Sequence, residues 1–236
     1  MIAFLCAAIA TSPLPLLAQP LRLSSLLVEF RRNAFRFWDK RGQLCEALIA
    51  DYGTLKFLGV SPGSPDRIGA DLGIPQRNGW VAYDQATLED SSPSDVLEAA
   101  SKGMVFLRRA ERLLEVKSYD RIGLRMQFLS VAPGALSSVA RATVGINDRP
   151  SWELENFAIG FRALDTDWDA TLTLSPRVSL SDAGPRFEGE LLIDIDQWRL
   201  NVPYPEAIAI DLGQLIDRGR TLANVFAARL STEGVQ

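Results

Sequence analysis

The sequence contains no histidine among its 236 residues. This absence excludes Ser-His-Asp and Cys-His catalysis, and it excludes zinc sites that use an imidazole ligand. Any general acid or base must therefore be a carboxylate, lysine, tyrosine or cysteine side chain. Large classes of hydrolase and metalloprotease are excluded by this one missing residue type.

Cysteine is scarce as well, since the chain has only Cys6 and Cys45. Two cysteines cannot form a four-cysteine zinc site within one chain, and their separation is far from the CxxC spacing of redox motifs. The glycines are spread over loops and form neither a GxGxxG nor a Walker A motif. No metal site and no cofactor are therefore expected.

An excess of positive charge is also missing, because 25 basic residues are outnumbered by 29 acidic ones, for a net charge of −4. A protein that binds nucleic acid needs a basic surface to release phosphate counterions, so no nucleic-acid partner is expected. The densest basic run contains Arg31, Arg32, Arg36, Lys40 and Arg41. It is interpreted as a solvated face of the protein.

Charged side chains are absent from residues 1–20. This stretch is interpreted as an N-terminal extension, because a signal peptide needs a positive n-region; the alternative is a signal peptide over residues 1–18. The segment is too short and too interrupted by proline to cross a membrane. We expect a cytoplasmic protein with no membrane partner, or an exported one if the alternative holds. Residues 21–236 are expected to form a single domain.

Two stretches alternate apolar and polar side chains, as is typical of half-buried strands. In residues 121–128 one face carries Ile122, Leu124, Met126 and Phe128, and the other carries Arg121 and Arg125. In residues 190–198 one face carries Leu191, Ile193 and Ile195, and the other carries Asp194 and Asp196. One core needs both apolar faces, so the two arginines are predicted to lie beside the two aspartates on the opposite face.

The order of the remaining elements predicts the fold class. Helices are predicted over residues 38–52, 96–116, 133–144 and 212–230 from apolar side chains at helical spacing. Further strands are predicted over 21–30, 79–83, 157–164 and 170–174, while 59–78 is interpreted as a loop and 201–205 as an extended linker. This order predicts an α+β fold with a mainly antiparallel sheet and helices packed mostly on one face. The last helix is expected to pack on the two alternating strands.

Residues 191–196, Leu-Leu-Ile-Asp-Ile-Asp, are similar to the first metal-binding strand of nucleotide cyclase and diguanylate cyclase palm domains. In those enzymes such aspartates hold two Mg²⁺ ions. The Gly-Gly-Asp/Glu-Glu-Phe hairpin that they also need is absent downstream. A Mg²⁺-dependent nucleotide-processing enzyme that uses Asp194 and Asp196 is therefore an alternative function, and aspartates paired with arginines are the expectation.

Four short motifs spread over most of the chain carry a resemblance to a known family. They are Leu26-Leu27-Val28-Glu29-Phe30, residues 120–125, residues 192–196 and residues 225–231. On these the chain resembles a sporadically distributed bacterial family of uncharacterised proteins of about this length. Met126 and Gln127 stand where family members have tyrosine and asparagine, and a histidine near the last helix is missing. The resemblance implies a cytoplasmic protein with no known enzymatic activity.

The missing catalytic residues and the resemblance together predict a non-catalytic cytoplasmic protein that acts by binding a partner. The partner is expected to be another protein, and the role to be accessory to a mobile or defence-type locus. The candidate binding residues are Arg121, Arg125, Asp194 and Asp196. The alternatives are the Mg²⁺-dependent enzyme and an exported binding protein.

Overall fold

The computed structural model describes residues 21–59, 66–73, 76–91, 93, 95–131, 158–164, 167–181 and 184–232. Its helices are α1 (Arg36–Tyr52), α2 (Val96–Leu114), α4 (Tyr204–Ile208) and α5 (Leu212–Thr232). Its strands are β1 (Arg22–Arg31), β2 (Leu55–Leu58), β3 (Arg67–Asp71), β4 (Arg77–Ala82), β5 (Gln85–Asp90), β6 (Ser118–Val131), β7 (Ile159–Ala163), β8 (Asp169–Ser181) and β9 (Gly184–Pro203). The predicted N-terminal extension, residues 1–20, and the helix predicted over 133–144 lie outside the described residues.

Within the described residues the strands form one nine-stranded sheet in the order β2-β3-β4-β5-β1-β6-β9-β8-β7. Every neighbouring pair of strands runs antiparallel. β1 is the middle strand, because it pairs with β5 on one side and with β6 on the other. The antiparallel sheet with separate helices confirms the predicted α+β class.

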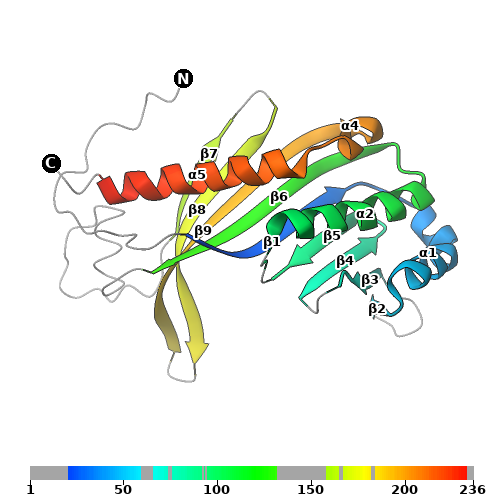
Figure 1. Cartoon of the computed structure of the whole chain (residues 1–236), viewed down its shortest axis with the longest axis horizontal. Helices are drawn as coiled ribbons and strands as arrows, with labels where there is room; N and C mark the ends of the chain where they lie inside the picture. The colour runs from blue at the N-terminus through cyan, green and yellow to red at the C-terminus, as the bar shows by residue number, and fades with distance from the viewer. Residues whose placement is uncertain are drawn as a thin grey trace.

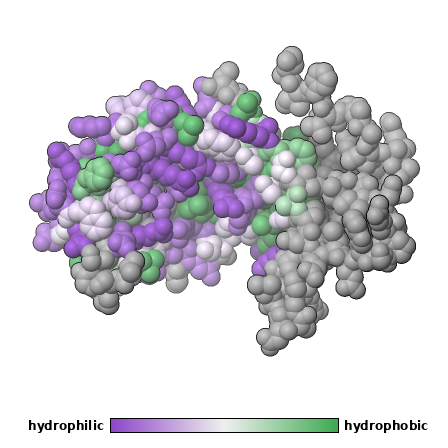
Figure 2. Space-filling model, turned by 180° about the vertical axis from the view of Figure 1, so that it is seen from behind, coloured by the Kyte–Doolittle hydropathy of each residue, from purple (hydrophilic) through white to green (hydrophobic). Residues whose placement is uncertain are grey.

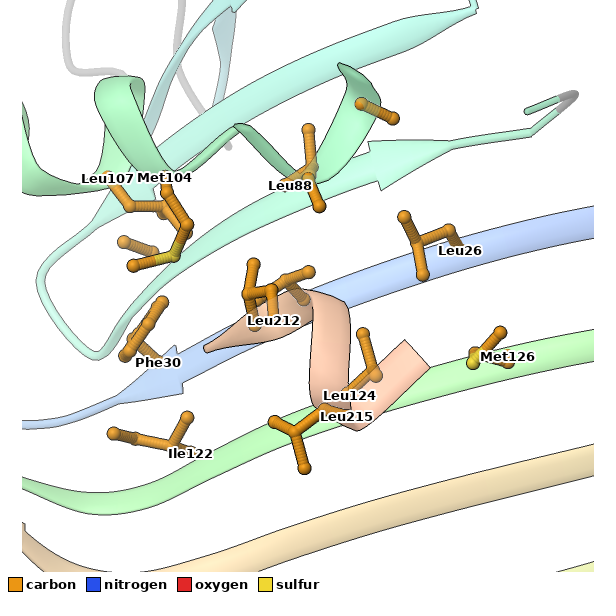
Figure 3. Packing of buried hydrophobic residues seen from close by; sticks show 14 of the residues in the cluster. Leu26, Phe30, Leu88, Met104, Leu107, Ile122, Leu124, Met126, Leu212 and Leu215 are labelled. Atoms are coloured by element: carbon orange, nitrogen blue, oxygen red, sulfur yellow. The ribbon is translucent and has the colours of Figure 1, made fainter. Parts of the chain in front are cut away.

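The long helices lie on one face of this sheet. α2 packs across β4 and β5, and α5 packs across β6 and β9 on the same side (Figure 1). α1 packs beside α2 and against β2 and β3. A hydrophobic core fills the space between these layers, and Leu212 and Leu215 of α5 lie over β1 and β6 in it (Figure 3). Among the described residues, no helix is both long enough and apolar enough to cross a membrane.

The two alternating stretches are neighbouring strands, β6 and β9. Their register pairs Met126 with Ile195 and Phe128 with Ile193, and all four side chains are buried. Burying an apolar side chain of this size stabilises a fold by about 1.5–3 kcal/mol. The prediction that both apolar faces belong to one core is confirmed.

α5 comes very close to the sheet at Gly219. A β-carbon at Gly219 would lie 2.6 Å from the sulfur of Met126 and 2.9 Å from the side-chain nitrogen of Gln197. That nitrogen donates a hydrogen bond to the carbonyl oxygen of Leu215, 3.1 Å away. The last helix is therefore docked on β6 and β9, as predicted, at a residue that has no side chain.

The ends of α1 and α2 follow from local sequence. The side chain of Asp95 accepts a hydrogen bond of 2.9 Å from the backbone N–H of Glu98 and so caps the first turn of α2. Gly53 follows α1 with φ of 79°, a positive value that glycine adopts without a steric penalty. Both ends agree with the helices predicted over 38–52 and 96–116.

Two segments differ from their predictions. Residues 59–78 include β3 and the start of β4 instead of one continuous loop. Gly69 of β3 faces the indole ring of Trp80, and a β-carbon there would come within 2.4 Å of that ring. Glycine usually weakens a strand, but in β3 the ring of the next strand fills the space that it leaves.

Residues 201–205 do not form a linker. β9 continues to Pro203, and α4 begins at Tyr204. Pro205 stands in the first turn of α4, where the missing N–H of proline removes no helical hydrogen bond. The two prolines therefore mark the junction of a strand and a short helix.

Candidate binding surface on the open sheet face

We call the side of the sheet opposite α2 and α5 the open face. Its centre consists of Leu27, Glu29 and Arg31 of β1, Arg121, Gly123 and Arg125 of β6, and Asp194, Asp196 and Trp198 of β9. Buried side chains that face the helices alternate along β9 with partly exposed ones that face outward. Seen from this side, the described part of the molecule is mostly hydrophilic (Figure 2).

The four charged residues predicted to share a face come together as two ion pairs. The Nη2 group of Arg121 donates hydrogen bonds to both carboxylate oxygens of Asp196, at 2.7 and 2.8 Å. The Nε group of Arg125 donates to both carboxylate oxygens of Asp194, each at 2.9 Å. The prediction that the arginines of one strand lie beside the aspartates of the other is confirmed.

The pairing is diagonal, and a glycine makes it possible. Arg125 stands directly opposite Asp196 in the register, yet it bonds to Asp194. Asp196 instead accepts from Arg121, whose guanidinium group extends across Gly123. A β-carbon at Gly123 would lie 3.1 Å from Nη1 and 3.2 Å from Cζ of Arg121. The missing side chain therefore leaves the space in which Arg121 lies against the sheet.

The ring of Trp198 contacts two guanidinium groups. The Cζ atoms of Arg121 and Arg162 lie 5.5 and 5.7 Å from the ring centroid, within the range of cation–π attraction. Arg121 also donates from Nη1 to Glu29 at 2.7 Å, and Arg31 contacts the same carboxylate oxygen at 2.8 Å. Arg121 is thus held by two carboxylates and an aromatic ring.

Opposite charges alternate at the centre of the open face. Each of the three arginines Arg31, Arg121 and Arg125 contacts a carboxylate. Burial raises the pKa of the Asp196 carboxyl group, and the charge of Arg121 opposes that shift. The hydrogen bond from Arg125 to Asp194 raises the pKa of Arg125. The network carries opposite charges in contact, with no surplus of either sign.

A depression of about 80 Å³ opens between β1 and β6 at the centre of the open face. It is lined by Leu27, Glu29, Arg31, Arg121, Gly123, Arg125 and Asp196. Pockets that hold nucleotides and other small organic ligands measure roughly 300–1,000 Å³. The depression therefore suits one protruding side chain of a partner better than a small-molecule substrate.

The geometry does not favour the alternative of a Mg²⁺ site on Asp194 and Asp196. Each carboxylate already contacts a guanidinium group, which supplies the positive charge that a metal ion would bring. Within the described ranges, no group of three histidine, cysteine, aspartate or glutamate side chains could hold a metal ion. The arrangement offers paired charges and an aromatic ring for contact with another surface.

Sequence reasoning missed Glu29, Arg31 and Trp198 as members of this surface. The signal was present, because Glu29 and Arg31 alternate with the apolar residues Val28 and Phe30 along the sequence. Trp198 follows Asp196 by two residues and therefore falls on the same face of β9. Alternation does not reveal that β1 lies beside β6, and this adjacency brings Glu29 to Arg121.

The basic run at residues 31–41 is not a uniformly solvated face, so that interpretation was wrong for Arg32. The Arg32 side chain is buried and donates to both carboxylate oxygens of Glu111 on α2, at 2.7 and 3.2 Å. Arg36 and Lys40 pair with the exposed Glu115 instead. A buried guanidinium group is tolerated because a carboxylate neutralises it at close range.

The comparisons with known proteins identify no family. No family model matches the sequence, and no curated protein matches it. The crystal structure of DynU16, a protein in the dynemicin biosynthetic locus, is 14% identical, and the alignment covers 91% of this chain and 97% of that one with a TM-score of 0.23. A likeness at this level supports no conclusion about fold or function. The resemblance to a bacterial family stays a prediction.

Proposed function

We propose that the protein is a non-catalytic binding protein and that the open face is its interface with a partner protein. The observation that carries the proposal is the ring of Trp198, which contacts the guanidinium groups of Arg121 and Arg162. Tryptophan and arginine dominate the energetic hot spots of protein interfaces. Because Arg121 is already held by Glu29 and Asp196, its immobilisation on binding loses little entropy.

The balance of charge supports a protein partner over a nucleic acid. The central arginines contact carboxylates of the same face, so little positive charge remains to displace counterions from a phosphate backbone. Interleaved charges of both signs favour a partner with the complementary pattern, because such patterns steer association and set its register. The central depression would accept one side chain of that partner.

The Mg²⁺-dependent enzyme is the competing function, and thermal melting separates the two. A bound metal ion would raise the melting temperature of the wild type but not that of the Asp194→Asn/Asp196→Asn variant. The binding proposal expects no metal-dependent rise in either protein. The cytoplasmic location and the accessory role at a mobile or defence-type locus remain predictions, and the proposal depends on neither.

Crosslinking in cells that produce the protein naturally tests the interface. A photo-reactive amino acid at position 27, on the open face, is compared with one at position 97 on α2. Leu97 is a matched control because it is also a leucine and its side chain is 58% exposed. We expect position 27 to capture one discrete protein, which mass spectrometry identifies, and position 97 to capture none.

Binding of the captured protein in purified form completes the test. Trp198→Ala should weaken the affinity roughly 30-fold, the effect typical of a hot-spot residue. Leu97→Ala should leave the affinity unchanged. The melting temperature of each variant verifies that it is folded. Equal affinities of the wild type and a folded Trp198→Ala protein would refute the proposal.

A further inference from the structure

The middle strand divides the open face into two halves that match each other. β1 is the fifth of the nine described strands, with β5 and β4 on one side and β6 and β9 on the other. The registers place Trp80, Thr87, Glu29, Gly123 and Trp198 in one row across these strands. At the usual strand spacing, the two tryptophans therefore stand roughly 10 Å from β1 on opposite sides.

The next row has opposite charges at equal distances from β1. Leu27 of β1 pairs with Glu89 of β5 on one side and with Arg125 of β6 on the other. Within the described part of the chain, Glu89 has no ion-pair partner. Arg125 contacts Asp194 and is still 48% exposed. A carboxylate with no ion-pair partner among the described residues and an accessible guanidinium group thus flank Leu27.

We propose that the open face binds the open face of a second copy of this chain. The two copies are related by a two-fold axis that is parallel to β1 and lies between the two faces. The inference rests on the proposed function and names the partner. Rotation about this axis places each strand of the second copy opposite the strand of the first copy that lies equally far from β1 on the other side. Residues that share a row therefore face each other. Trp80 then meets Trp198 of the second copy, and Glu89 meets its Arg125.

The contacts made by this arrangement are mutually complementary. Every contact away from the axis occurs twice, because the interface is isologous. Two indole pairs can stack in offset geometry, and two ion pairs form between the copies. Leu27 lies at the axis and meets Leu27 of the second copy, so an apolar contact stands between the ion pairs.

Charges that lie on the axis are compensated within each chain. Glu29 and Arg31 are also on β1, so Glu29 approaches Glu29 of the second copy and Arg31 approaches Arg31 of the second copy. Arg31 contacts Glu29 at 2.8 Å, and Arg121 donates to the same carboxylate at 2.7 Å. Each copy therefore brings paired charges to the axis, which avoids the large penalty of an isolated buried charge.

The twist of the sheets preserves the contacts nearest the axis. Sheets that pack face to face keep their strands within about 30° of each other. The resulting displacement grows with distance from the axis, so Glu89 and Arg125, one strand away, stay opposed. The broad indole rings of Trp80 and Trp198 tolerate the larger shift two strands away.

Sedimentation and crosslinking of the purified chain test the second copy directly. In analytical ultracentrifugation the mass should rise from 26.0 kDa toward twice that value as the concentration rises through the micromolar range. In a chain carrying Cys6→Ser and Cys45→Ser, a short bismaleimide should join two copies of Leu27→Cys, because facing sheets lie about 10 Å apart. Leu97→Cys in the same background should not be joined. A monomer at every concentration, or equal crosslinking at both positions, overturns the inference.

Double-mutant cycles on dimer dissociation test the axis. Trp80→Ala and Trp198→Ala should each raise the dissociation constant roughly 30-fold, and the double variant should lose little more than either single one. Glu89→Gln and Arg125→Gln should be non-additive in the same way. Melting temperatures confirm that each variant is folded. If these substitutions leave the dissociation constant unchanged, or if their effects are additive, the contact lies on another surface or axis. Either result overturns the inference.

Crosslinking in cells distinguishes failure of this inference from failure of the proposed function. If position 27 captures a different protein while the purified chain stays monomeric, the second copy is excluded and the open face remains an interface. If position 27 captures nothing and the chain is monomeric, both proposals fail. Capture of the chain itself at position 27 supports both.

Discussion

Two arginine–carboxylate pairs in this protein have the same chemistry and opposite surroundings. The side chains of Arg32 and Glu111 lie in the core and are 1% and 2% exposed. Those of Arg121 and Asp196 lie on the open face and are 18% and 34% exposed. The nitrogen–oxygen distance is 2.7 Å in both pairs. The direct contact is the same, so what each pair does depends on the groups around it.

The buried pair satisfies its remaining polar groups inside the protein. The Nη1 group of Arg32 donates to the carbonyl oxygen of Ala82 at 2.7 Å, while its Nε and Nη2 groups donate to the two carboxylate oxygens of Glu111. The ring of Tyr119 packs on that of Phe30, with centroids 5.1 Å apart. These contacts join β1, α2 and β6, and water cannot replace any one of them without entering the core.

On the open face, water can replace a contact that is broken. Exposed ion pairs therefore contribute little to stability, typically about 0–1 kcal/mol. The same exposure leaves Arg125 and its neighbours accessible to a second surface. The comparison shows that the position of an ion pair, and not the distance between its charged groups, decides how much it contributes to folding.

Removal of Glu111 should have the largest effect on stability. Glu111→Ala leaves the guanidinium group of Arg32 buried without a counter-charge, which should reduce the free energy of unfolding by about 3–5 kcal/mol. Urea denaturation followed by circular dichroism measures the loss. Glu98→Ala, on the same helix but exposed and paired with Lys102, is the matched control and should lose far less. Equal losses in the two variants would abolish the contrast between buried and exposed pairs.

Tyr119, which packs beside the buried pair, should make the stability of the fold decrease at alkaline pH. Burial raises the pKa of its hydroxyl group above the ordinary value of about 10. Above that pH the unfolded chain releases this proton while the folded chain keeps it, so stability that is present below about pH 10 is lost as the pH rises. Between about pH 9 and pH 11, the wild type should lose about 1.4 kcal/mol more than Tyr119→Phe.

The measurement is the free energy of unfolding at the two pH values, obtained by urea denaturation. The partly exposed Tyr83 provides the control, because Tyr83→Phe should keep the loss seen in the wild type. If Tyr119→Phe loses as much stability as the wild type, the hydroxyl group ionises within the fold. The cluster around Glu111 would then be open to water.

The other ion pair of the open face, Arg125 with Asp194, should show the smallest effect, because Arg125 is more exposed than Arg121. A double-mutant cycle with Arg125→Ala and Asp194→Ala should give a coupling energy of about 0.2–1 kcal/mol in the free energy of unfolding. Added salt should reduce it, because exposed charges are screened. A coupling near that of a buried pair, about 3 kcal/mol or more, would mean that the open face is shielded from water and that its charges serve the fold.

The alternation within each single strand was enough to predict on which face of the sheet each side chain lies. Successive side chains of a strand point to opposite faces, so the face of Arg121 and of Asp196 follows without knowledge of neighbouring strands. The actual partners do not follow in the same way. The diagonal pairing depends on the space over Gly123 and on the ring of Trp198, which stand on different strands.

Three strands, β2, β3 and β5, were not predicted from the sequence, and β3 and β5 show why. β3 is short and contains Gly69, and β5 ends in Glu89 and Asp90, so neither has the apolar alternation of β6. Both are strands because their neighbours supply the missing contacts. Gly69 is covered by Trp80 of β4, and Asp90 is neutralised by Arg77 of the same neighbouring strand.

Local properties of the sequence determined that histidine-dependent chemistry is excluded, where α1, α2 and α5 lie, and which faces of β6 and β9 are apolar. These follow from residue types and from spacings of two to four residues, which any fold of this chain must accommodate. The tertiary structure alone decided that β1 is the middle strand and that Arg32 is buried. In the sequence, Arg32 is one more cation in a basic run. It is a core residue because the fold brings it into contact with Glu111 of α2, 79 residues further along the chain. The energy of that contact exists only when the chain is folded, so no local pattern records it.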